Sequence, residues 1–180
     1  MHRTTTCVIV TAVLLAACGE GTSGGPGPQA PSSLSGTAPD FALDDVNGEE
    51  FRLADHFGES VMLLNFWATW CEPCRIEMPH LDRIQAAYRD RGLRILCIAM
   101  DGPESVAQVR SHVSRYDFSF TVLLDEESEV TQLYNPRRAA PFNALIDRSG
   151  SIVWSHEGYA PGDEAELERQ IAALLSGNDE

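Results

Sequence analysis

The sequence predicts an α/β domain with three layers: a mixed central sheet, flanked by helices and preceded by a β-hairpin. Two continuous apolar segments, residues 61–66 and 93–100, have the length of strands that are buried on both faces. Residues 74–91, which lie between them, have helical periodicity, and this order predicts a right-handed crossover between parallel strands. A second hairpin, formed by residues 142–147 and 152–155, should then add antiparallel strands to the same sheet.

The remaining elements follow from turn and helix signals. Asn47-Gly48 is a strong turn signal between residues 41–43 and 50–52, and it predicts the N-terminal hairpin. Asp163 is placed to cap the last helix. Further helices are expected at residues 103–116, 128–134 and 163–175, and a further strand at residues 120–124.

Length and charge restrict the function. A chain of 180 residues favours one domain with short additional segments. The net charge of −14 argues against a nucleic-acid partner, because binding to phosphates requires a basic surface. No motif in the sequence calls for a cofactor or a resident metal.

The N-terminus has the pattern of an export signal. An apolar segment, residues 7–17, follows Arg3 and is too short to span a bilayer. It ends in Leu15-Ala16-Ala17-Cys18, which resembles the lipobox of bacterial lipoproteins and implies cleavage before Cys18 and lipidation of this cysteine. The alternative is an ordinary secretory signal, cleaved near Ala17, that leaves Cys18 as a free thiol. Both interpretations place the domain in a compartment that permits disulfides.

These observations divide the chain into four parts. We expect a lipoprotein signal peptide at residues 1–17 and an α/β domain at residues 38–176. A lipidated cysteine and a tether rich in Gly, Pro and Ser occupy residues 18–37, because such a composition cannot bury enough apolar surface to fold. Residues 177–180 form a short tail.

A Cys-x-x-Cys motif carries the chemistry that we expect. Cys71-Glu72-Pro73-Cys74 lies between a buried strand and a helix, which is the context in which this motif is redox-active. Cys71 falls where the helix should begin, so free backbone N–H groups and the helix dipole can stabilise its thiolate, the form that attacks a disulfide. Cys74, one turn later, can then resolve the mixed disulfide. Pro73 suits the first turn, because its missing N–H costs little there.

The domain resembles the thioredoxin superfamily, in particular its TlpA/ResA-like extracytoplasmic branch. The resemblance covers about residues 37–175 and implies a thioredoxin-like fold and thiol–disulfide oxidoreductase activity. The central motif is highly specific, whereas the first one is shared with peroxiredoxins. The matching residues are Ala38-Pro39-Asp40-Phe41 with Gly48, the segment NFWATWCEPC at 65–74, and Glu77-Met78-Pro79.

The resemblance also implies a cis proline that faces the cysteines, just before a strand that ends in Asp-x-x-Gly. Pro141 occupies this place, so we expect a cis bond between Ala140 and Pro141. Ala140 would then present its backbone for strand-like pairing with an extended substrate. Family members often have Thr-Thr or Glu-Thr after this proline, whereas this chain has Phe142-Asn143, and the departure bears on substrate identity.

Two carboxylates near the motif have expected roles. Cytoplasmic thioredoxins usually have an aspartate at the position of Asn65, and an asparagine cannot exchange a proton. Glu77, one turn beyond Cys74 on the same helix face, is therefore the candidate general base, and the resemblance to ResA-like proteins supports this role. The alternative is an exposed glutamate in ordinary surface ion pairs. Glu72 places negative charge beside the Cys71 thiolate, which favours the disulfide and makes the protein a reductant.

Three other functions fit parts of the sequence. Cys71 and Cys74 have the spacing of half a zinc site, and Met78 or His80 could help them to carry copper, but no second Cys-x-x-Cys or His pair completes a zinc site. A thiol peroxidase fits the hairpin, but the Pro-x-x-x-Thr-x-x-Cys pattern is absent. A static structural disulfide is disfavoured by Glu-Pro at a helix start. Cys97 lies among apolar residues and is expected to be buried.

The resulting hypothesis is a membrane-anchored reductase that acts on disulfides of client proteins outside the cytoplasm. Cys71 is the nucleophile, Cys74 resolves, Glu77 assists proton transfer and Pro141 shapes substrate docking. The resemblance implies apocytochrome c among the clients, and hence cytochrome c biogenesis, with a membrane thiol donor as the source of electrons. We expect a monomer in the periplasm or on the outer face of the cell membrane, held there by the lipid on Cys18.

Overall fold

The computed structural model describes Met1 and residues 36–177. The expected signal peptide, Cys18, residues 19–35 of the expected tether and residues 178–180 of the tail lie outside the described residues.

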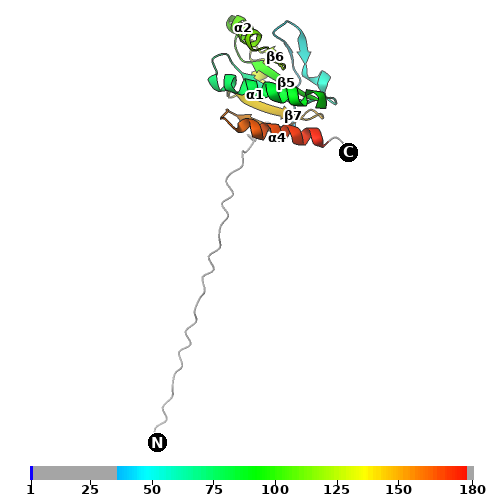
Figure 1. Ribbon diagram of the computed structural model, residues 1–180, viewed down its shortest axis with the longest axis vertical. Coiled ribbons are helices and arrows are strands. Elements are labelled where there is room, and N and C mark those ends of the chain that lie inside the picture. Colours follow the sequence, from blue (N-terminus) through cyan, green and yellow to red (C-terminus); the bar gives the residue numbers. More distant parts are fainter. Residues whose placement is uncertain (2–35, 178–180) are drawn as a thin grey trace.

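The core of the molecule is a six-stranded mixed sheet with the order β1-β8-β7-β4-β5-β6 (Figure 1). Strands β4, β5 and β6 run parallel, and β7, β8 and β1 are each antiparallel to the neighbour on the β4 side. The predicted fold class, a mixed sheet with flanking helices and an N-terminal hairpin, is confirmed. The bounds are β1 Gly36–Thr37, β4 Val61–Trp67, β5 Leu93–Ala99, β6 Thr121–Leu124, β7 Phe142–Ile146 and β8 Ser151–Glu157.

The N-terminal hairpin forms a separate two-stranded sheet. Its strands, β2 Ala42–Asp44 and β3 Glu50–Arg52, pair antiparallel around the predicted turn, in which Gly48 has a φ of 87°. The turn contacts the large sheet, because Val46 N–H donates to the Val122 carbonyl of β6 at 3.0 Å.

Two buried apolar clusters hold the helices against the sheet. On one face, α1 Glu72–Tyr88, α4 Asp163–Ser176 and α2 Val106–Tyr116 contribute Leu81, Ile171 and Val109 to a common cluster. On the other face, α3 Glu129–Tyr134 contributes Val130 and Tyr134 to a second cluster. Strands β4 and β5 place alternate side chains in the two clusters, as expected for strands that are buried on both faces.

Three local features differ from the sequence expectations. Gly36–Thr37 pair with β8, so the folded domain includes at least two residues before residue 38. Residues 103–105 form a 3-10 turn, η3 Pro103–Ser105, and α2 begins only at Val106. Asp163 does not cap α4 with its side chain: Gly162 occupies the cap position in a left-handed conformation, and the Asp163 carboxylate accepts from Ala160 N–H at 2.8 Å instead.

Within residues 36–177, no helix combines the length and the apolar character that crossing a bilayer requires.

Candidate active site

Cys71 and Cys74 form a disulfide at the start of α1, directly after the loop that follows β4. Their Cα atoms are 5.4 Å apart. Cys71 is the N-cap residue of α1, and its Sγ accepts a hydrogen bond from the backbone N–H of Cys74 at 3.2 Å. A sulfur in this position lies at the positive end of the helix dipole, which stabilises a thiolate when the disulfide is reduced. Pro73 lies in the first turn, as predicted.

The disulfide is covered on the inside and bordered by exposed residues on the outside. Cys71 and Cys74 are only 3% and 1% exposed, and both belong to the apolar cluster under α1. Trp67 is completely buried in the same cluster, whereas Trp70, directly before Cys71, is 70% exposed. A partner would therefore meet Trp70 and the first turn of α1 before it reaches the sulfur atoms.

Asp101, two residues after the end of β5, holds the loop that leads to Cys71. Its carboxylate is buried and accepts from Thr69 N–H at 2.9 Å and from the Thr69 hydroxyl at 2.5 Å. Sequence reasoning missed Asp101, because its partner lies 32 residues away in the chain. The available signal was an aspartate that closely follows a buried strand, β5, which pairs with β4, the strand before the Cys71–Cys74 motif.

The Ala140–Pro141 peptide bond is cis, as the resemblance implied. Ala140 packs against the apolar cluster that contains both cysteines. The loop before it is held by Asn135, a buried side chain that sequence reasoning also missed: its Nδ2 donates to the Ala139 carbonyl at 2.7 Å and its Oδ1 accepts from Ala139 N–H at 2.9 Å. Asn135 thus closes a short ring that fixes the approach to Pro141.

Glu77 is buried under the first turns of α1, with an exposed fraction of 3%. The interpretation of Glu77 as a surface glutamate is therefore wrong. Its two carboxylate oxygens accept from Asn65 Nδ2 at 2.9 Å and from Asn143 Nδ2 at 2.7 Å. Asn65 lies on β4 and Asn143 on β7, where the two are direct cross-strand partners. Glu77 and Cys74 are three residues apart on α1, a spacing that places two side chains on the same helix face.

Comparison with known proteins supports a single family. The Redoxin family profile matches residues 34–171. The chain belongs to the Redoxin family. Within it, the chain is 36% identical over 120 residues to the thiol-disulfide oxidoreductase ResA of Geobacillus kaustophilus, covering 67% of each chain. Together with the Cys71–Cys74 pair, this makes it a ResA-like member of the thioredoxin superfamily.

Solved structures lead to the same fold. A Chlorobium tepidum protein assigned as a thiol:disulfide interchange protein DsbE is similar with a TM-score of 0.72 and 36% identity, over 79% of this chain and 99% of the other. The exposed lipoprotein thioredoxin Etrx1 of Streptococcus pneumoniae is similar with a TM-score of 0.61 and 27% identity, over 73% of this chain and 99% of the other.

In this Redoxin-family chain the surroundings of Glu77 shift the pKa of its carboxyl group toward neutrality. Burial raises the pKa of Glu77 to about 7, while the hydrogen bonds from Asn143 and Asn65 act in the opposite direction. The negative charges of Asp163 and Glu164 at the start of α4 raise it further. A carboxyl group with a pKa close to neutrality can both take up and release a proton under working conditions.

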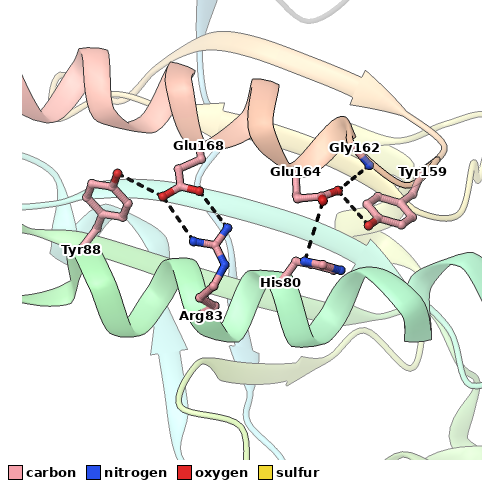
Figure 2. A network of polar contacts seen from close by, with 7 residues as sticks. All are labelled: His80, Arg83, Tyr88, Tyr159, Gly162, Glu164 and Glu168. Atoms are coloured by element: carbon pink, nitrogen blue, oxygen red, sulfur yellow. Dashed lines mark hydrogen bonds and ion pairs between the residues drawn. The ribbon is translucent and has the colours of Figure 1, made fainter.

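Polar contacts of α4 with α1 and with the loop before α4 fix the position of Glu164 (Figure 2). Glu164 accepts from the Tyr159 hydroxyl and from Gly162 N–H, both at 2.9 Å, and lies 3.9 Å from His80 of α1. One turn further along both helices, Glu168 binds Arg83 in a two-pronged ion pair. The two glutamates therefore hold α4 beside the helix that carries Cys74 and Glu77.

The third described cysteine is buried, as predicted. Cys97 has no exposed surface, and burial raises the pKa of its thiol well above the usual value. A thiol that resists ionisation in this way is a poor nucleophile. Among residues 36–177, no group of three or more His, Cys, Asp and Glu side chains gathers to hold a metal ion.

Proposed function

We propose that this thiol–disulfide oxidoreductase reduces disulfides in client proteins outside the cytoplasm. The observation that carries the proposal is the Cys71–Cys74 disulfide at the start of α1, where Cys71 Sγ already accepts a backbone N–H. The same contact would stabilise the Cys71 thiolate after reduction, and a thiolate is the nucleophile in disulfide exchange.

The reaction runs in two exchanges. The Cys71 thiolate attacks one sulfur of the client disulfide, so that a Cys71–client bond forms and the second client sulfur leaves as a thiolate. Glu77 takes the proton from the Cys74 thiol, and the Cys74 thiolate then attacks Cys71 Sγ. The Cys71–Cys74 bond forms, the client leaves with two reduced sulfurs, and the proton on Glu77 passes to the departing thiolate or to water.

The direction of electron flow is supported by charge. Glu72 is exposed between the two cysteines, and its negative charge disfavours the neighbouring thiolate relative to the disulfide. Equilibration with a thiol redox buffer tests the direction. A reduction potential near that of thioredoxin, about −270 mV, supports a reductase, whereas a value near that of DsbA, about −120 mV, would make the protein an oxidant and overturn the proposal.

The order of the two cysteines has its own test. Cys74→Ser leaves Cys71 free to attack but removes the resolving thiol, so mixed disulfides with clients should accumulate and survive non-reducing electrophoresis. Cys71→Ser should trap few or none. Equal trapping by both variants would contradict the assignment of Cys71 as the nucleophile.

Glu77 is the proposed acid–base group, and Glu77→Gln removes its proton exchange at nearly constant volume. We expect kcat/KM for disulfide reduction at pH 7 to fall about 100-fold, which is the lower range for a general acid–base catalyst. The variant should also lose the limb of the pH–rate profile near pH 7. A profile that keeps this limb in Glu77→Gln would exclude the role.

Attachment to the membrane through a lipid on Cys18 is the second part of the proposal. It rests on the lipobox-like segment at 15–18 and is supported by the similarity to an exposed lipoprotein thioredoxin. Labelled palmitate should enter the wild-type protein and be absent from Cys18→Ser, which should also appear in the soluble extracytoplasmic fraction. Label in the Cys18→Ser variant would contradict the anchor.

Partners follow from the same reaction. Each cycle leaves the cysteines oxidised, so a membrane thiol donor must return two electrons, and apocytochrome c is the proposed client in cytochrome c biogenesis. We propose a monomer, since the exchange needs only one Cys71–Cys74 pair. Trapping with Cys74→Ser followed by mass spectrometry identifies both classes of partner, and sedimentation velocity measures the oligomeric state.

A further inference from the structure

Glu77, Asn65 and Asn143 form a closed ring of side chains inside the apolar cluster under α1. Three elements contribute, one residue each: α1, β4 and β7. All three residues are at most 3% exposed. Asn143 Nδ2 donates to one Glu77 oxygen at 2.7 Å, Asn65 Nδ2 donates to the other at 2.9 Å, and Asn65 Nδ2 also donates to Asn143 Oδ1 at 3.0 Å.

The hydrogen-bond pattern of the ring matches an ionised carboxylate. An ionised carboxylate only accepts, and both amides turn their NH₂ groups toward it. Protonation of Glu77 would put an O–H group opposite an N–H donor, and the ring would lose a hydrogen bond. Asn65 Oδ1 is buried and has no partner among the described residues. A protonated Glu77 could use this acceptor only if the Asn65 amide turned over, which would break its bond to Asn143.

The ring and the burial of Glu77 therefore have opposite effects on the pKa of its carboxyl group. Desolvation favours the neutral form of Glu77, and two charge-assisted hydrogen bonds favour the charged form. The shorter of the two comes from Asn143, whose side chain is oriented in turn by Asn65. Without Asn143, the carboxylate would keep its burial and lose its nearest donor.

We propose that Asn143, supported by Asn65, is a positioning residue that keeps Glu77 charged and aimed along α1, so that Glu77 can accept the proton of Cys74. This inference rests on the proposed role of Glu77 as the proton acceptor. Asn143 lies two residues after the cis proline, where the sequence departs from the residue pairs common in the resembling family. The departure thus serves proton transfer inside the protein and not only contact with a client.

Other charged and titratable groups act on Glu77 without belonging to the ring. Asp163 and Glu164 raise its pKa from the start of α4. Burial raises the pKa values of Tyr159 and Cys97, and the charge of Glu77 raises them further. The titratable groups on the elements packed around the ring are Cys71 at the N-cap of α1, Cys74 and His80 of α1, Cys97 of β5, His156 of β8, Tyr159 of the following loop, and Asp163 and Glu164 of α4.

Asn143→Leu tests the inference, because leucine has a similar shape and cannot donate a hydrogen bond. The protonation of Glu77 is read from the ¹³C chemical shift of its side-chain carboxyl group as a function of pH, in the full-length disulfide form labelled at glutamate. Glu77→Gln assigns the signal. We expect the titration midpoint of Asn143→Leu to lie at least about one pH unit above the wild-type value, since a lost hydrogen bond to a charged group corresponds to roughly one to two units.

Kinetics supply the second readout. The alkaline shift of the Glu77 titration should appear as an equal shift of the pH–rate limb, with about a tenfold loss of kcat/KM at pH 7 and recovery at higher pH. Leu145→Val is the matched control, because it loosens β7 on the same face, two residues away, without touching an amide. It should leave both the titration and the pH–rate limb unchanged. Asn65→Leu should shift both in the same direction and replaces Asn143→Leu if that variant does not fold.

The outcomes separate this inference from the proposed function. If the wild-type pH–rate limb survives in Glu77→Gln, the role of Glu77 fails and the inference fails with it. If Glu77 controls the limb but both asparagine variants titrate as the wild type does, the proposed function stands and the inference is overturned. A shift as large in Leu145→Val as in Asn143→Leu would also overturn it, because packing and not the amide would then set the charge.

Discussion

Asp101 accepts hydrogen bonds from both the backbone N–H and the hydroxyl of Thr69, two residues before Cys71. The contact joins the end of β5 to the loop that presents the disulfide. Asp101→Ala would leave the half-buried Thr69 N–H without its acceptor, and hydrogen bonds to charged groups contribute about 1.5–3 kcal/mol. We expect the free energy of unfolding to fall by about 2 kcal/mol in urea titrations. Asp101→Asn, which keeps one acceptor oxygen, should lose less, and equal losses would contradict the role of the second oxygen.

Glu77 should make the stability of the oxidised protein depend on pH. Its folded-state pKa of about 7 lies above the ordinary value of 4.5 for a glutamate, so the native state binds more protons than the unfolded state between these values. Stability is therefore highest below pH 4.5 as far as this group is concerned, and it is lost as the pH rises toward 7. A shift of this size corresponds to roughly 3 kcal/mol.

The difference in unfolding free energy between wild type and Glu77→Gln isolates this contribution. Urea titrations between pH 4.5 and 8 should show a wild-type stability that declines relative to the variant as the pH rises. A constant difference over this range would mean that Glu77 titrates alike in the folded and unfolded states.

Asn135 should support both stability and client turnover, because it holds Ala139 on the approach to the cis proline. Asn135→Ala removes a donor and an acceptor from a buried position, and we expect a loss of about 2 kcal/mol in unfolding free energy. KM for a protein disulfide should rise more than KM for a small disulfide, since only the protein needs the loop as a docking surface. Gln132→Ala, on the exposed side of α3, should change stability by at most about 0.5 kcal/mol.

Gly150 lies where a side chain would be costly in two ways. Its φ is +81°, and a Cβ atom would come within 3.2 Å of the Phe57 ring. Gly58 has a similar φ of +86° but open space around it, so Gly58→Ala measures the backbone cost alone. We expect about 1–2 kcal/mol for Gly58→Ala and about 2–4 kcal/mol for Gly150→Ala, measured by urea unfolding. Equal losses would show that Phe57 moves aside freely.

Local signals predicted most of the fold and the reactive pair. The apolar runs around 61–66 and 93–100 became β4 and β5, and the Cys71–Cys74 motif was readable because four adjacent residues and their strand–helix context specify it. The predictions of the start of α2 and of the cap of α4 were less accurate. Residues 103–105 form a tighter 3-10 turn before α2. At α4, Gly162 takes the cap position in a left-handed conformation, and no side chain caps the helix.

The support of the site was not readable from the sequence. In the sequence, Asn143 is only a departure from a family pattern. Its contact with Glu77 was not predicted, because the two residues are 66 positions apart. Asp101 and Asn135 carry no motif, and their function depends on where the loops return in space. The sequence periodicity did not indicate the burial of Glu77, because a glutamate on a helix is usually solvated.

The pairing of β1 with β8 and the contact of the hairpin turn with β6 affect how far the sheet edges are open to client proteins. Exposed sheet edges invite strand addition, and a reductase meets segments that are unfolded while their cysteines are accessible. Gly36–Thr37 cover one end of β8, and the turn at Asp45 and Val46 covers β6 by a bridge to Leu123 and a hydrogen bond to Val122. These positions are therefore already paired, which leaves a shorter stretch of the outer strands open to a captured segment.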